Sequence, residues 1–206
     1  MVTLTDASGG MSRAAIPLAL TLLRVLLAPV IVLLAVYHAP PAAFAACLLA
    51  AALSDYFDGA LARRFKVVTT TLRRLDSIAD TIFTLAALLA VWLLHPAIIH
   101  EHAYALSALF TLEALRYAYD FAKFGREASY HMWSSKLWGL TLVIAFFAVL
   151  VFGGGSTATG VAIAFGILAD IEGLAISTLL PEWRNDVPTV VHALGVRRSW
   201  QGARVA

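Results

Sequence analysis

Residues Ala14–Tyr37 read AAIPLALTLLRVLLAPVIVLLAVY, and Arg24 is the one charged residue in this stretch. A helix of this length measures about 36 Å, which is enough to cross a hydrocarbon core about 30 Å thick. The stretch lacks a small-residue cleavage site after a short apolar core, so we expect a retained helix rather than a signal peptide. It therefore predicts a membrane-spanning helix near the start of the chain.

The composition of the whole chain agrees with this prediction. Of its 206 residues, 61% are hydrophobic and 14% are charged, against about 45–50% and about 25% in a soluble domain. These proportions exclude a soluble enzyme, a disordered chain and a free nucleic-acid-binding protein, so we expect no nucleic-acid partner. The single cysteine, Cys47, lies in an Ala/Leu run, where we expect a small core residue.

Five further apolar stretches follow the first, separated by short turn-like breaks. We therefore expect an all-α, polytopic membrane protein with six transmembrane helices in one domain over residues 1–206. Residues 1–13 and 181–206 are expected to be cytoplasmic. The six stretches are Ala14–Tyr37, Ala42–Arg64, Leu72–Leu94, Ala103–Phe121, Lys136–Phe152 and Thr159–Leu180.

The basic residues predict the orientation of these helices. The loops at 38–41, 95–102 and 153–158 fall on one side of the membrane and contain no Lys or Arg, whereas the opposite side carries the basic residues. The positive-inside rule places that opposite side, and with it both termini, in the cytoplasm. We expect the membrane to be a bacterial inner membrane.

Charged residues inside the predicted helices lie at a similar depth. Counted from the outer end of each helix, they lie about 18–27 Å down, in the inner third of the hydrocarbon core. This convergence predicts a polar cavity open to the cytoplasm, although structural ion pairs between helices would give the same pattern. The residues are Arg24, Asp55, Asp58, Asp76, Asp80, Arg116, Lys136 and Glu172.

Four aspartates stand out within this layer. Asp55 and Asp58 share one helix face at i,i+3, and Asp76 and Asp80 share another at i,i+4. Facing carboxylates repel one another unless cations neutralise them. Hard oxygen ligands suit Mg²⁺ or Mn²⁺, and four carboxylates suit two ions. We therefore expect a metal site rather than structural pairs.

The aspartates belong to a longer motif. Asp55-Tyr-Phe-Asp58-Gly59-Ala60-Leu61-Ala62-Arg63 is followed, after eight residues, by Leu72-Arg-Arg-Leu-Asp76-Ser-Ile-Ala-Asp80. This pattern resembles the CDP-alcohol phosphatidyltransferase signature D-x2-D-G-x2-A-R-x8-G-x3-D-x3-D. The chain departs from it at one position, where Leu72 replaces glycine. The resemblance implies six transmembrane helices, with the signature on the second and third, and a homodimer.

The resemblance also implies a reaction and roles for residues. Enzymes of this family transfer a phosphoalkyl group, commonly phosphatidyl from CDP-diacylglycerol, to an alcohol and release CMP in phospholipid biosynthesis. The implied partners are a CDP-linked lipid donor, a small alcohol acceptor and membrane lipids. Asp55, Asp58, Asp76 and Asp80 would bind metal, with Asp80 as the general base. The implied nucleotide-binding residues are Gly59, Ala62 and Arg63.

The sequence leaves the identity of the acceptor alcohol open. Arg116, Arg126 and Lys136 could bind the phosphate of a phosphorylated alcohol, although Arg126 and Lys136 also suit anionic lipid headgroups. An acidic set beside aromatic residues suits an amino-alcohol cation instead. That set is Glu113, Asp170 and Glu172.

Two other functions remain as alternatives to an enzyme. Carboxylates within membrane spans also mark cation transporters, but transport favours acidic groups toward both faces, and here they gather toward one. A non-catalytic lipid-binding relative is the other alternative, and its support is Leu72 at the glycine position. Release of CMP from a CDP-lipid separates the enzyme from both alternatives.

Overall fold

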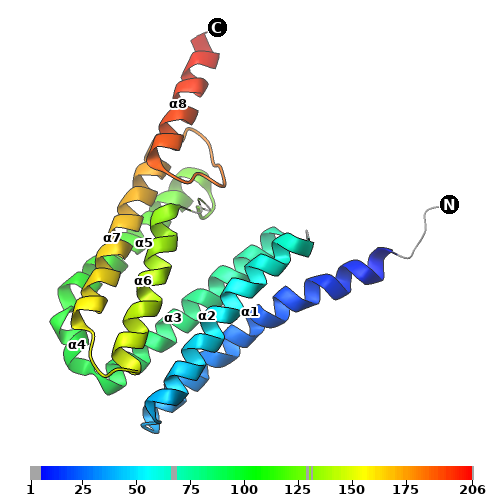
Figure 1. Ribbon diagram of the computed structural model, residues 1–206. Coiled ribbons are helices and arrows are strands. Elements are labelled where there is room, and N and C mark those ends of the chain that lie inside the picture. The colour runs from blue at the N-terminus through cyan, green and yellow to red at the C-terminus, as the bar shows by residue number, and fades with distance from the viewer. Residues whose placement is uncertain (1–5, 66–68, 129, 131, 206) are drawn as a thin grey trace. The chain divides into compact units, whose positions relative to one another are not determined.

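The computed structural model describes residues 6–65, 69–128, 130 and 132–205, with side chains described except at 6–14, 62, 63, 70, 73 and 202–205. Every regular element in these ranges is a helix, which confirms the predicted all-α class. Figure 1 shows the elements along the chain. They are α1 (Asp6–Val36), α2 (Pro41–Phe65), α3 (Thr70–Leu94), α4 (Pro96–Glu101), α5 (Ala103–Phe124), α6 (Trp133–Leu150), α7 (Ser156–Leu179) and α8 (Val190–Val205).

Five of these helices are long and apolar enough to cross a membrane. The candidate spans are Ala15–Val36, Pro41–Leu61, Arg74–Leu94, Trp133–Leu150 and Ser156–Leu179. The fourth predicted span corresponds to α5, which is not among them. From position 113 onward it carries Glu113, Arg116, Asp120 and Lys123, and these charges lower its hydropathy. The finding supports an integral membrane protein, and a sixth span through α5 remains a prediction.

The helix bounds differ from the predicted ranges mainly at the two ends of the chain. The first helix begins at Asp6, so the segment expected to precede the first span continues into it as helix. The tail contains α8, which apolar patterning did not predict because polar and basic residues interrupt its apolar ones throughout. The short α4 also appears between α3 and α5, where Pro96 occupies the first position, which favours proline.

The structure divides into two compact units. The first comprises Met1–Ile99 with Phe146–Gly154. Within it α1 packs against both α2 and α3, and Figure 1 shows these three helices side by side. The buried side chains along them include many alanines, which allow close approach of helix backbones. Cys47 is a free, buried thiol in this core, as predicted.

The second unit comprises His100–Ala145 with Gly155–Ala206. Here α5 and α8 both pack against α7. Gly166 lets side chains of α5 and α6 pack directly against the α7 backbone. A Cβ at this position would lie 2.8 Å from Leu109 Cδ1 and 2.8 Å from Trp138 Nε1. A cluster of buried side chains lies toward the end of α7. It contains Tyr130, Met132, Ile176, Leu180, Val187 and Ala193.

Candidate functional site

The four motif aspartates lie on facing surfaces of α2 and α3. Asp55 and Asp58 are one turn apart on α2, and Asp76 and Asp80 are one turn apart on α3. One carboxylate oxygen from each of Asp55, Asp76 and Asp80 lies within 4.8 Å of the other two. Asp58 is the buried member, with a side chain 5% exposed. The structure thus brings together the four residues that the spacing placed on shared faces.

Arg24 of α1 contacts all four carboxylates. Its Nη2 lies 3.2 Å from Asp55 Oδ1 and 2.7 Å from Asp58 Oδ2. Its Nη1 lies 3.0 Å from Asp76 Oδ1 and also pairs with Asp80 Oδ1. One terminal nitrogen therefore serves the aspartates of α2, and the other serves those of α3.

Thr21, one turn before Arg24, adds a polar contact to the same group. Its buried hydroxyl lies 3.3 Å from Asp58 Oδ2 and 3.1 Å from the carbonyl oxygen of Pro17. Pro17 itself lies within α1, and a proline removes a helical hydrogen bond in the turn that contains it. The first helix therefore supplies both a hydroxyl and a guanidinium to the aspartates.

The donor set fits a hard divalent cation. Two oxygens on opposite sides of one Mg²⁺ are about 4.2 Å apart, since each Mg–O bond is about 2.1 Å. The 4.8 Å limit for Asp55, Asp76 and Asp80 exceeds this by a few tenths of an ångström, which small side-chain rotations cover. All the ligands are carboxylate oxygens, which is the chemistry that Mg²⁺ and Mn²⁺ prefer. The residues present therefore fit the expected metal site.

The motif positions between the aspartates are described in part. Gly59 is half-buried and follows Asp58 on α2. The side chains of Ala62 and Arg63 lie outside the described residues. Leu72 lies in the first turn of α3, one turn before Asp76, and its backbone N–H donates to the Thr69 hydroxyl oxygen that caps the helix. Leu72, which replaces the glycine of the family signature, therefore lies at the start of the helix that carries Asp76 and Asp80.

A second polar group links α5 and α7. Arg116 Nε lies 3.0 Å from Asp170 Oδ1, and the Asp170 side chain is 2% exposed. The other carboxylate oxygen of Asp170 is buried and has no hydrogen-bond partner among the described residues. Arg116, predicted for acceptor binding, is therefore paired with a buried carboxylate.

The same two helices share a hydrogen-bonded chain one turn further along. The Ser177 hydroxyl donates to Asp120 Oδ1 at 2.5 Å, and the Tyr130 hydroxyl lies 2.9 Å from Ser177 Oγ. Burial raises the pKa of the Tyr130 hydroxyl. Lys123 donates to the carbonyl oxygens of Ser177 and Thr178, at 2.7 and 3.1 Å. The sequence patterns did not predict these hydrogen bonds, although Asp120 follows Arg116 at i,i+4 and therefore shares its helix face.

The other two predicted acceptor residues each lie over an aromatic ring. The guanidinium of Arg126 is 4.8 Å from the centre of the Trp183 ring, and Lys136 Nζ is 4.4 Å from that of Trp133. A cation over the face of an aromatic ring is attracted by the negative potential of that face. Of the three predicted cations, Arg116 thus pairs with a carboxylate, whereas Arg126 and Lys136 each lie over a tryptophan ring.

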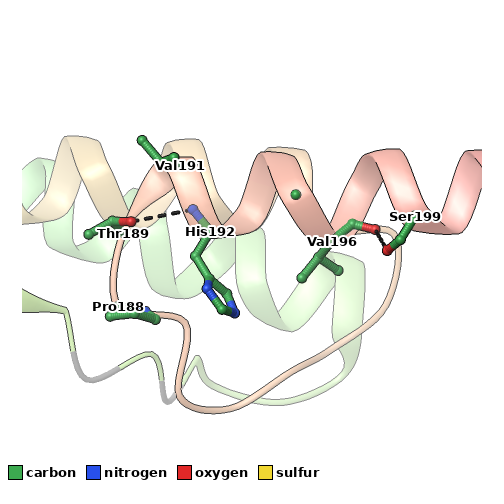
Figure 2. Close-up of a pocket in the computed structure, with 7 residues that line it drawn as sticks. Pro188, Thr189, Val191, His192, Val196 and Ser199 are labelled. Atoms are coloured by element: carbon green, nitrogen blue, oxygen red, sulfur yellow. Dashed lines mark hydrogen bonds between the residues drawn. The ribbon is translucent and has the colours of Figure 1, made fainter.

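An open groove of about 550 Å³ lies along the start of α8. Figure 2 shows that the Thr189 hydroxyl accepts the backbone N–H of His192, and that Ser199 donates to the Val196 carbonyl. These side chains complete the hydrogen bonding of the helix itself. The residues that line the groove include no Asp or Glu, so none of the motif aspartates contributes to it.

Comparison with known proteins identifies one family. The family model described as CDP-alcohol phosphatidyltransferase matches residues 14–171, which include all four aspartates and Arg24. No curated protein and no solved structure matches the chain.

Proposed function

Because the chain belongs to the CDP-alcohol phosphatidyltransferase family, we propose that it transfers a phosphatidyl group from CDP-diacylglycerol to an alcohol and releases CMP. Enzymes of this family are phosphotransferases that act on CDP-alcohols. One observation supports the proposal above all: the four aspartates of the signature converge on one point between α2 and α3. The reaction would serve phospholipid biosynthesis.

In this proposal the aspartates hold the divalent ions. Asp55, Asp58 and Asp76 are ligands, and Asp80 completes the set. Bound Mg²⁺ or Mn²⁺ would neutralise the pyrophosphate of the donor and stabilise the departing CMP. Asp58 is buried, and a carboxylate in a membrane span needs a cationic partner, which Arg24 supplies in the structure and a divalent ion would supply in the proposed site.

Asp80 is proposed as the general base. Its side chain is 49% exposed, so an acceptor hydroxyl can approach it. The carboxylate takes the hydroxyl proton while the acceptor oxygen attacks the phosphorus linked to the lipid alcohol. A new phosphodiester bond forms, the bond to the bridging oxygen breaks, and CMP leaves with that oxygen. The proton remains on Asp80 until solvent removes it.

Further residues are proposed to bind the substrates. Gly59 and Ala62 would let the nucleotide approach the α2 backbone, and Arg63 would bind phosphate through its planar donors. Arg116, Arg126 and Lys136 are proposed to bind a phosphorylated acceptor. For Arg116, the pairing with Asp170 engages Nε and leaves the terminal nitrogens as separate donors. The amino-alcohol alternative rests on Glu113, Asp170 and Glu172.

The proposed setting is a bacterial inner membrane, with α5 as a sixth span and the basic side, the active site and both termini cytoplasmic. The absence of Lys and Arg from the loops at 38–41, 95–102 and 153–158 supports this orientation. A tag on either terminus should be labelled only after the membrane is opened. Labelling of either tag in intact cells would contradict the six-span arrangement. By family resemblance we also propose a homodimer.

The deciding experiment is a CMP-release assay on the purified full chain in detergent. It uses CDP-diacylglycerol, Mg²⁺ or Mn²⁺ and a panel of free and phosphorylated alcohols, with Asp58→Asn as the inactive control. Release of CMP that depends on one alcohol supports the enzyme and identifies the acceptor. A folded chain that binds metal and nucleotide but releases no CMP with any alcohol would favour the non-catalytic relative. Metal flux through vesicles without CMP release would favour the transporter.

A further inference from the structure

Arg24 is placed unusually for a charged residue in a membrane span. Its side chain is 2% exposed, and it lies within the candidate span Ala15–Val36. Its Nε is buried and has no hydrogen-bond partner among the described residues, so the contacts of the side chain run through the terminal nitrogens. Burying a guanidinium carries a large desolvation cost unless anionic partners offset it. The buried position of the Arg24 guanidinium is therefore stable only because the aspartates supply negative charge.

The charges of the group do not balance around Arg24. Four carboxylates contact this one guanidinium. A single positive charge offsets one of four negative charges, and the remaining carboxylates repel one another across the gap between α2 and α3. Arg24 holds the two helices together in this arrangement, yet it leaves a strong attraction for further cations.

The guanidinium also contacts the carboxylates that a metal would need. Asp55, Asp76 and Asp80 form the group whose oxygens could share an ion, and each of them contacts Arg24. A divalent ion bound to these oxygens would lie within a few ångströms of the guanidinium, where two positive centres repel strongly in a medium of low dielectric constant. The ion and the guanidinium therefore compete for the same carboxylates.

We propose that Arg24 is a built-in counter-cation of the aspartate site, which stabilises the metal-free chain and which divalent ions must displace in order to bind. This inference rests on the proposed metal-dependent function. Arg24 would then set the metal affinity: it lowers the affinity by competition, and it keeps α1, α2 and α3 together while the site is without metal. Displacement also frees a planar cation at the place where the anionic donor is expected.

Arg116 provides a matched comparison. It is also an arginine paired with a buried aspartate, but it contacts one carboxylate, Asp170, and lies in the other compact unit. Removing the charge of Arg116 should destabilise the fold equally with and without metal. Removing the charge of Arg24 should destabilise the fold only when no metal is bound.

The test measures Mn²⁺ affinity and thermal unfolding of the full chain in detergent, so that it does not depend on turnover. The variants are Arg24→Met and Arg24→Gln, with Arg116→Met as the control. We expect both Arg24 variants to bind Mn²⁺ about tenfold or more tightly than the parent chain, because a competing charge is removed. In chelator they should unfold at a lower temperature than the parent, and Mn²⁺ should raise their unfolding temperature by more than it raises that of the parent.

The outcomes separate the two proposals. If neither the parent chain nor the Arg24 variants bind Mn²⁺, the metal site itself is wrong. If all bind Mn²⁺ and the Arg24 variants have equal or weaker affinity, the counter-cation inference is overturned while the metal site stands. If the variants fold only when purified in Mn²⁺ and unfold on chelation, the inference is supported. Variants that stay unfolded in Mn²⁺ as well would overturn it.

Discussion

The aspartate group of α1–α3 and the polar network between α5 and α7 both bury arginine against carboxylates, but they differ in charge balance. In the first, four carboxylates converge on one guanidinium. In the second, Arg116 pairs with one aspartate, while Asp120 is satisfied by the neutral Ser177 hydroxyl. Paired or neutralised groups stabilise helix contacts, whereas an excess of one sign calls for an ion. The difference separates a group whose excess negative charge favours a bound cation from a group whose carboxylates already have partners.

The largest expected effect follows from removing the ions. Chelation should reduce CMP release to background, because the unbalanced carboxylates can no longer hold the cations that neutralise the donor. The fold should persist, since Arg24 still bridges α2 and α3. The measurement is CMP release with excess chelator, followed by excess Mn²⁺ to restore it. Full activity in chelator would show that the aspartate group needs no metal, and it would then not differ in this respect from the α5–α7 network.

The next effect concerns Asp80. Asp80→Asn keeps the shape and an oxygen ligand but cannot accept the acceptor proton, so CMP release should fall by about 10²–10⁴-fold. Nucleotide-dependent thermal stabilisation in Mn²⁺ should persist. Asp186→Asn is the control, because Asp186 is exposed and asparagine tolerates its φ of 56°. Near-normal turnover of Asp80→Asn would contradict the role as base, and loss of nucleotide stabilisation would assign Asp80 to metal binding.

A smaller effect should appear in the α5–α7 network. Ser177→Ala removes the donor to the buried Asp120 carboxylate, so the free energy of unfolding should fall by about 1–3 kcal/mol. Turnover per folded molecule should not change. Ser134→Ala is the matched control, because the buried Ser134 hydroxyl has no partner among the described residues. Thermal unfolding in detergent measures the stability of both variants. Equal destabilisation by the two substitutions would contradict a specific contribution of the Ser177–Asp120 hydrogen bond to stability.

The smallest effect concerns the departure from the family motif. Leu72→Gly should lower the KM for the CDP-lipid if leucine crowds the nucleotide, and it should cost about 1 kcal/mol of helix stability. Leu75→Gly carries a similar backbone cost in the same helix and serves as the control. Steady-state kinetics over a range of donor concentrations compare the two. An unchanged KM in Leu72→Gly would show that the glycine position does not limit donor binding.

Much of the architecture follows from local patterns. Long apolar stretches predicted helices because an apolar segment in a membrane must satisfy its backbone hydrogen bonds internally. The motif spacing predicted the facing aspartates because i,i+3 and i,i+4 positions share a helix face. The family match over residues 14–171 confirms the resemblance that these positions carried. The helix α8 was missed because its polar composition has no apolar run.

The sequence by itself determined the helical class, the family and the pairing of aspartates on two helices, since each depends on residues close together in the chain. Only the tertiary structure decided which side chains meet across helices. It placed Arg24 among all four aspartates and joined Asp120 to Ser177, which lie 57 positions apart. Counting residues along the predicted spans puts Arg24 at the expected depth of the aspartates, but such a count carries no information on rotation about the helix axis. That rotation is set by packing, and it decides whether a buried charge finds one partner or four.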